Sequence, residues 1–253
     1  MKIFVLTKKT LMLAAIALLV AAFSLPTFFD TIETSVSARE LPIYSVQTDE
    51  KKIAVTFDSA WNDNDIDKII NVLTEQSCPA TFFVTGDWAE RFPESLKKLH
   101  SAGHEIASHS YNHTLYSTLS KDEIIADMDK CDSTIESVLG IRPSLMRAPS
   151  GDYTNNSILA CKETGRLCIQ WDVDSLDWKD LTEEEMKKRI FSKVQNGSIL
   201  LFHNGTKQTA DALPGILQAL KNEGYSFVKV GDLIYKENYS IDHTGRQSKT
   251  DSN

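Results

Sequence analysis

Short runs of β-forming residues alternate with amphipathic helical stretches along most of the chain, and this alternation constrains the fold more than any other feature. The apolar runs predict seven strands, at residues 53–57, 80–84, 105–108, 145–146, 168–171, 198–202 and 226–230. Between them, apolar spacing predicts helices at residues 65–75, 93–102, 120–139, 155–164, 182–195 and 210–222. Strands that alternate with helices form parallel βαβ units. The sequence therefore predicts an α/β fold, either a (β/α) barrel or a doubly wound sheet.

Two of the predicted helices carry recognisable end signals. Ser120 followed by Glu123 is the pattern of a capping box, in which each residue satisfies a backbone N–H of the other. Gly140 can adopt the left-handed conformation that ends the same helix. Thr182 and Glu185 repeat the capping box before a later helix. These signals support the predicted helix boundaries.

The first 30 residues differ in composition from the rest of the chain. Three lysines within the first nine residues precede an uncharged, mostly apolar run at residues 11–23. Cations before an apolar core are typical of an export signal, and they keep the N-terminus in the cytoplasm. We therefore expect residues 1–30 to form an uncleaved membrane anchor, with cleavage near residues 35–38 as the alternative.

The remainder of the chain divides into three parts. Residues 31–51 are polar and lack a helical period, which predicts a stalk. Residues 52–235 contain every predicted element and are expected to form a single catalytic domain. The polar residues 236–253 are expected to form a tail that frays.

Charge and cysteine content limit the partners of this chain. The formal net charge is -8, and no stripe of Lys and Arg follows the N-terminus, so we expect no nucleic-acid partner. We expect a monomeric body outside the cytoplasm, anchored in the cell membrane or secreted. The four cysteines contain no C-x-x-C pair, and disulfides and buried thiols both remain open.

Polar side chains stand at the C-terminal ends of several predicted strands. The C-terminal ends of parallel strands meet at one rim, which is the catalytic face of a (β/α) barrel. Scattered surface residues would not show this placement, so the pattern favours a barrel over a doubly wound sheet. The residues at or just after these ends are Asp58, His109, Arg147, Asp174, Asp177 and His203.

Two of these positions allow a structural as well as a functional interpretation. His109 and His113 could chelate a divalent metal if their segment makes a helical turn, or they could be a capping or solvated pair. Asp58 ends an apolar strand, where an unpaired carboxylate is costly. Arg147 could pair with it, and such an ion pair can be architectural or catalytic.

His203 closes an apolar strand, and a carboxylate beside it would keep its imidazole protonated near neutral pH. Either Asp174 or Asp177 could supply that carboxylate. A satisfied core histidine is the alternative. Pro149 and Gly151 would fix a tight loop and leave an amide free to donate to an oxyanion.

In order and spacing, these residues resemble the five motifs of the NodB-homology polysaccharide deacetylases, carbohydrate esterase family 4. The resemblance extends from about residue 52 to residue 235, and within the family it is strongest to the sporulation-type deacetylases of spore-forming Gram-positive bacteria. The motifs read Thr-Phe-Asp at 56–58, His-Ser-Tyr-Asn-His at 109–113, Arg-Ala-Pro-Ser-Gly at 147–151, Asp-Ser-Leu-Asp-Trp at 174–178 and Leu-Phe-His at 201–203.

The resemblance implies a distorted (β/α) barrel of seven or eight strands. It also implies metal-dependent hydrolysis of N-acetyl groups on peptidoglycan or another glycan that contains N-acetylglucosamine. The expected metal is zinc, with cobalt, nickel or another divalent ion as alternatives. The implied general base is Asp58, oriented by Arg147, and the implied acid is His203, tuned by Asp177. The implied metal ligands are His109 and His113, and the oxyanion and substrate residues are Ser150, Tyr153 and Trp178.

The chain departs from the family at one position. The first motif of the family usually has a second aspartate that binds the metal, whereas this chain has Ser59. A neutral hydroxyl is a poor ligand, so we predict weak metal binding unless a nearby carboxylate substitutes. Asp65 is the candidate, ahead of Asp63, although Asp65 is equally well placed to cap the next helix.

The same departure keeps a second class of function open, in which the chain binds wall glycan with little or no turnover. Asp58, Arg147, Asp177 and His203 argue against it, because a binding protein needs no base and acid. A third possibility is an amidase that acts on a small amide. The export signal disfavours it.

Overall fold

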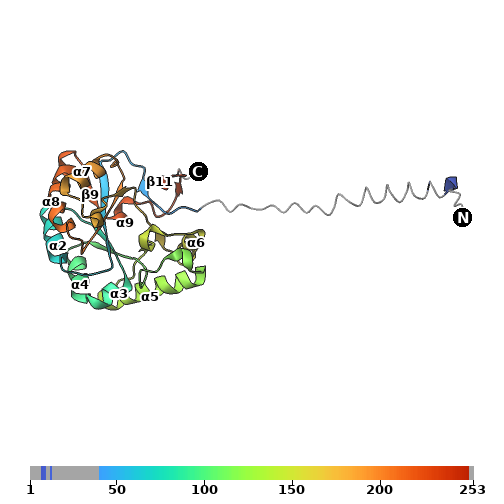
Figure 1. Ribbon diagram of the computed structural model, residues 1–253, viewed down its shortest axis with the longest axis horizontal. Helices are drawn as coiled ribbons and strands as arrows, with labels where there is room; N and C mark the ends of the chain where they lie inside the picture. The colour runs from blue at the N-terminus through green and yellow to red at the C-terminus, as the bar shows by residue number, and fades with distance from the viewer. Residues whose placement is uncertain (1–6, 10–11, 13–39, 251–253) are drawn as a thin grey trace, which may run out of the picture. The chain divides into compact units, whose positions relative to one another are not determined.

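The computed structural model describes residues 7–9, 12 and 40–250 (Figure 1). The chain divides into two units, residues 1–39 and 40–253, and the second contains all the elements described here. The predicted membrane anchor at residues 1–30 lies almost entirely outside the described residues. Within the residues described, no helix has the length and apolar character needed to span a membrane.

One eight-stranded sheet forms the centre of the fold, and its strands all pair in parallel. The strand order is β6-β5-β4-β3-β2-β8-β7, and β9 pairs with β2 outside this path. The strands are β2 (Lys52–Ser59), β3 (Thr81–Val84), β4 (Glu105–Ser108), β5 (Leu145–Met146), β6 (Leu167–Cys168), β7 (Val173–Asp174), β8 (Ile199–His203) and β9 (Ser226–Val228).

The connection between β6 and β7 shows that this sheet is curled into a barrel. The two strands stand at opposite ends of the strand order, yet only residues 169–172 separate them in the chain. Five residue steps span at most ~18 Å, so the two edges of the sheet lie close together. The fold is therefore the expected distorted barrel. The prediction of a single strand at 168–171 is wrong. Strand β6 ends at Cys168, and the residues after it cross to β7 at the other edge of the sheet.

The helices cover the outside of this sheet (Figure 1). They are α2 (Ile66–Glu75), α3 (Gly86–Arg91), α4 (Pro93–Ser101), α5 (Lys121–Leu139), α6 (Asn155–Glu163), α7 (Glu183–Phe191), α8 (Thr209–Asn222) and α9 (Val230–Leu233). The capping boxes predicted for α5 and α7 both form, and Gly140 ends α5 at φ 71°. The short helices α3 and α9 were not predicted, because they are too short to show an apolar period.

The core is built on β2, which is buried from Ile53 to Ser59. The ring of Phe57 stacks on Phe82 of β3 at 4.7 Å between centroids, and it lies 5.8 Å from Phe202 of β8. Three neighbouring strands are thus locked together by one aromatic cluster. This packing fixes the register of β2 against β8 and hence the position of the residues at their C-terminal ends.

Parts of the segments expected to be a stalk and a frayed tail, residues 45–46 and 246–247, instead pair with each other. A second sheet has the order β1-β11-β10, formed by Ser45–Val46, Arg246–Lys249 and Tyr239–Ile241. Gln247 is fully buried there, and its side chain bonds both the backbone N–H and the carbonyl of Tyr235. The prediction of fraying is therefore wrong for residues 236–250. Polar composition misled it, because backbone pairing and a buried amide need few apolar side chains.

Candidate active site

The C-terminal ends of β2 and β8 place two polar side chains next to each other. Asp58 lies one residue before the end of β2, His203 ends β8, and the two are register partners in the parallel sheet. His109 and Arg147 directly follow β4 and β5, so their side chains start from the same edge. The structure therefore brings together the strand-end residues that the sequence predicted to converge.

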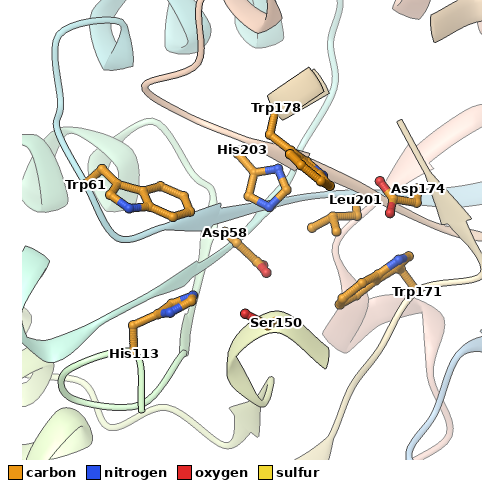
Figure 2. A pocket seen from close by; sticks show the side chains of 9 residues that line it. All are labelled: Asp58, Trp61, His113, Ser150, Trp171, Asp174, Trp178, Leu201 and His203. Carbon is orange, nitrogen blue, oxygen red and sulfur yellow. The ribbon is translucent and has the colours of Figure 1, made fainter. Parts of the chain in front are cut away.

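A cavity of about 370 Å³ opens at this edge of the barrel (Figure 2). Five of the predicted site residues line it, and the others either lie buried behind these five or point elsewhere. Two further aromatic side chains, Trp61 and Trp171, form much of the remaining wall. The residues that line the cavity are Asp58, Trp61, His113, Ser150, Trp171, Asp174, Trp178, Leu201 and His203.

Asp58 forms a buried ion pair with Arg147. Its carboxylate accepts a hydrogen bond of 2.7 Å from Arg147 Nη1, which also donates to Thr56 Oγ1 at 2.9 Å. The guanidinium carbon lies 3.9 Å from the ring centre of Phe83. Burial alone would raise the pKa of the Asp58 carboxyl, but its interactions with His109 and Arg147 lower the pKa below its usual value. Asp58 is therefore ionised at neutral pH.

His109 and His113 lie close together, although the segment that carries them does not form a helical turn. His113 has φ 58° and Ser110 has φ 69°, and the segment between them is irregular. The rings of His109 and His113 nevertheless meet edge to face at 5.1 Å between centroids. The segment is thus a loop with two left-handed residues, and the loop, not helical spacing, brings the imidazoles together.

His109 has the environment of a neutral ligand. Its Nδ1 lies 2.9 Å from the carbonyl oxygen of Arg147, which acts as acceptor and places the proton on Nδ1. Its Nε2 therefore keeps a free lone pair, 3.4 Å from the Asp58 carboxylate. Burial lowers the pKa of His109 to about 4, so the ring is uncharged at neutral pH. A backbone carbonyl on the second nitrogen is the usual support for a metal-binding imidazole.

These donors suit a divalent cation such as zinc, but they are few. Two imidazoles match the preference of zinc, which normally takes three or four protein ligands. Ser59 is fully buried, and its hydroxyl has no hydrogen-bond partner among the described residues. Across residues 40–250, no group of three His, Cys, Asp or Glu side chains could hold a metal. The site fits a cation through His109 and His113, one protein donor short of the usual number.

The structure does not bring Asp65 to these histidines. Its carboxylate accepts two hydrogen bonds of 2.9 and 2.8 Å from the backbone N–H of Gly205, in the loop after β8. Asp63 accepts a hydrogen bond of 2.7 Å from Ser95. Asp65 stands at the N-cap position of α2, but its side chain makes no capping bond there. Both aspartates hold the loop that carries them, and neither lines the cavity.

His203 faces the cavity with Asp177 directly behind it. Its Nδ1 lies 2.8 Å from Asp177 Oδ1, while Asp177 Oδ2 accepts from the backbone N–H of His203 at 2.6 Å. Asp174 lines the cavity, but its carboxylate bonds the backbone N–H of Leu176. Of the two candidate partners, Asp177 is therefore the one that contacts His203. Burial lowers the pKa of His203, but Asp177 outweighs it and raises the pKa above its usual value.

The three residues expected to contact substrate differ in position. Ser150 has φ 56° in the turn Pro149–Gly151, and its side chain reaches the cavity. Trp178 also lines the cavity and is exposed. Tyr153 does not line it, because its hydroxyl lies 3.2 Å from that of Tyr44, on the segment before β1. The structure thus places Ser150 and Trp178 at the cavity and Tyr153 beside Tyr44, and their contact with substrate stays a prediction.

Two aromatic residues of the cavity have no role predicted from the sequence. Trp171 lies in the crossing between β6 and β7, and Trp61 lies in the loop after β2. Neither belongs to a motif that defines the predicted chemistry. One signal in the sequence could have predicted Trp61 as a cavity residue. It lies three positions after Asp58, and residues that follow a strand end lie at the catalytic rim of a barrel.

Comparison with known proteins gives one family model and several similar proteins. A family model described as polysaccharide deacetylase matches residues 45–169. The peptidoglycan-N-acetylglucosamine deacetylase of Bacillus cereus is 30% identical over 195 residues, which are 76% of this chain and 71% of the relative. The peptidoglycan-N-acetylmuramic acid deacetylase PdaC of Bacillus subtilis is 32% identical over 189 residues, which are 75% of this chain and 40% of PdaC.

The protein YlxY of Bacillus subtilis is 32% identical over 193 residues, 76% of this chain and 60% of YlxY. The chain thus spans less than two thirds of YlxY and of PdaC. Among solved structures, BA3943, a CE4 family pseudoenzyme from Bacillus anthracis, superposes with a TM-score of 0.74 at 29% identity, covering 77% of this chain and 69% of that one. A mutant of BA3943 with restored enzymatic activity gives the same TM-score at 30% identity, covering 77% and 71%.

The contact between His203 and Asp177 predicts a specific pH effect. We expect Asp177→Asn to lower the pKa of His203, since the bonded charge that raises it is removed. Because the pKa of His203 is raised in the folded state, the pair stabilises the wild type at pH values below the unfolded-state pKa of 6.5. This stabilisation is lost as the pH rises through the folded-state pKa. The variant should therefore lose more stability at pH 5.5 than at pH 8.5.

NMR titration of the imidazole and urea unfolding at both pH values measure these two effects. Asp174→Asn is the matched control, because that carboxylate lies in the same cavity without bonding His203. A decrease in the His203 pKa at least as large in Asp174→Asn as in Asp177→Asn would contradict the assignment.

Proposed function

Because the chain belongs to the polysaccharide deacetylase family, we propose that it hydrolyses N-acetyl groups on the glycan strands of peptidoglycan. The names of its relatives support this substrate, since PdaC and the Bacillus cereus enzyme are both peptidoglycan deacetylases. Such a substrate lies outside the cytoplasm, which agrees with the export signal and the membrane anchor predicted for residues 1–30.

One observation carries the proposal. Asp58 and His203 both line the cavity, they are register partners on β2 and β8, and each has its own buried partner. The pKa of Asp58 is lowered and that of His203 is raised, so the two shifts favour a carboxylate base and an imidazolium acid in the same cavity. Amide hydrolysis needs this combination, because a proton must leave water while another reaches the departing nitrogen.

The residues then have the following roles. Asp58 takes a proton from the attacking water while the oxygen of that water bonds to the acetyl carbon. The backbone N–H of Ser150 donates to the carbonyl oxygen, where negative charge develops. His203 gives its proton to the amide nitrogen as the carbon–nitrogen bond breaks, so that acetate and a free amine leave. Arg147 and Asp177 keep the base and the acid in these protonation states.

His109 and His113 are the residues that would hold a divalent cation, zinc or a similar ion. When bound, such a cation polarises the acetyl carbonyl and lowers the pKa of the attacking water. The buried, neutral state of His109 and its bond to the Arg147 carbonyl support this role. With two imidazoles and no third protein ligand, we expect the ion to be held weakly.

Ser59 favours one alternative function, in which the chain binds wall glycan with little or no turnover. A buried hydroxyl without a partner stands where the family usually has a metal-binding aspartate. One similar structure, BA3943, is described as a pseudoenzyme. The two functions differ in whether acetate is released, and a direct assay separates them.

Acetate release from N-acetylated glycan strands tests the proposed function. We expect the full chain in the presence of Zn²⁺ to release acetate and to lose this activity on chelation. Asp58→Asn and His203→Gln should each reduce the rate ~10²- to 10⁴-fold, because each removes a positioned acid or base. Leu159→Ala, on the exposed face of α6, is the control and should keep the wild-type rate.

Absence of acetate release with saturating metal would overturn the deacetylase proposal. Binding of the same strands without release would then establish the alternative, a glycan-binding protein.

The missing ligand generates a second prediction. Ser59→Asp should tighten Zn²⁺ binding at least tenfold, since ~1.4 kcal/mol from one added anionic ligand has that effect. Asp65→Asn should leave Zn²⁺ binding unchanged, because its carboxylate bonds Gly205 and not the metal site. The measurements are the Zn²⁺ dissociation constant and the acetate-release rate of both variants. Loss of Zn²⁺ in Asp65→Asn, with no gain in Ser59→Asp, would contradict this account of the site.

A further inference from the structure

Tryptophan is concentrated at the cavity. Of the four tryptophans in the chain, Trp61, Trp171 and Trp178 line it, and the fourth, Trp88, is fully buried in α3. Trp61 and Trp178 are 54% and 57% exposed, although indole rings are usually well buried. Exposed indoles at the mouth of a polar cavity are therefore surfaces available to a ligand that has both apolar and polar faces.

Trp61 occupies the most informative position. Its ring centre lies 5.8 Å from that of His113 and 6.0 Å from that of His203. Figure 2 shows the indole on the same side of Asp58 as His113, with Trp171 on the other side. The indole of Trp61 therefore borders both the proposed metal-binding side and the proposed acid side of the cavity, within reach of a ligand that occupies both.

The loop that carries Trp61 is held rigidly by its backbone. Arg91 donates to the carbonyl oxygens of Ala60 and Trp61 at 3.0 and 2.8 Å. The buried indole of Trp88 donates to the carbonyl of Asn62 at 3.0 Å. With Asp63 and Asp65 also bonded, the loop is tied to α3, α4 and the segment after β8.

A rigid loop holds its aromatic ring in place before the ligand arrives. Binding then costs little conformational entropy, which is the advantage of a preorganised contact. The indole N–H of Trp61 donates to no other residue in the part of the chain that the structure describes, so it is available to a ligand hydroxyl. A purely structural tryptophan would bury its ring and satisfy this N–H.

We infer that Trp61 is a carbohydrate-stacking residue that holds one pyranose ring of the glycan over the space between His113 and His203. This inference rests on the proposed glycan substrate. A pyranose chair presents axial C–H groups on one face and hydroxyl groups at its edge, which matches an indole with a free N–H. Trp61 therefore favours a ligand that contains such a ring over a small linear amide, which has no comparable face.

The test is the affinity of a soluble glycan probe in the absence of turnover. The full chain is treated with chelator, and its dissociation constant for the N-acetylglucosamine tetramer is measured by ligand-observed NMR. We expect Trp61→Ala to weaken binding at least about fivefold, as for an aromatic contact of ~1 kcal/mol. Trp61→Phe should restore most of the affinity, because it keeps an aromatic face. Leu159→Ala, another exposed apolar side chain, should bind as the wild type does.

The outcomes separate this inference from the proposed function. If the wild type binds the tetramer and Trp61→Ala binds within twofold of it, the stacking role is overturned while the glycan substrate stands. If Trp61→Ala instead changes only the oligomeric state in light scattering, the ring contacts a second copy and the inference is also overturned. If the wild type binds neither the tetramer nor soluble peptidoglycan strands, the proposed function fails and the inference fails with it.

Discussion

The buried ion pair between Arg147 and Asp58 is the interaction on which the site depends. Two charges in a dry interior are expensive unless they are paired, and here the two terminal nitrogens of Arg147 bond Asp58, Thr56 and the carbonyl of Gln170. Its buried Nε has no partner among the described residues. The backbone carbonyl of the same arginine accepts from His109. Arg147 therefore orients Asp58, the proposed base, with its side chain, and the imidazole of His109, a proposed metal ligand, with its main chain.

A second pair, His203 with Asp177, performs the opposite task on the neighbouring strand. Asp177 raises the pKa of the His203 imidazole, whereas His109 and Arg147 lower the pKa of the Asp58 carboxyl, so the two pKa values shift in opposite directions within one cavity. Because β2 and β8 are locked in register by the ring of Phe57, the distance between acid and base depends on core packing, not on loops. The loop with Trp61 adds a surface for the ligand and leaves this geometry unchanged.

The sequence was sufficient for features with a local signal. Strand-end polar residues such as Asp58 and His203, and caps such as Ser120, are read from neighbours in the chain. It was insufficient where the outcome depends on distant contacts. Asp65 bonds Gly205, 140 positions away, so no local pattern could separate a metal ligand from a loop support.

The polar strands of the second sheet could not be predicted for the same reason. They form because residues near the two ends of the described body pair with each other. Almost all of residues 1–30, the predicted anchor, lie outside the described residues, and anchoring stays a prediction.

The central claim is that Arg147 and Asp58 act as one unit, and a double-mutant cycle in unfolding free energy tests it most directly. The full chain is unfolded in urea as wild type, Arg147→Met, Asp58→Asn and the double variant. We predict that each single variant loses about 3–5 kcal/mol, and that the double variant loses at least ~2 kcal/mol less than the sum. Losses that add within about 0.5 kcal/mol would show that the two residues are independent and would contradict the account.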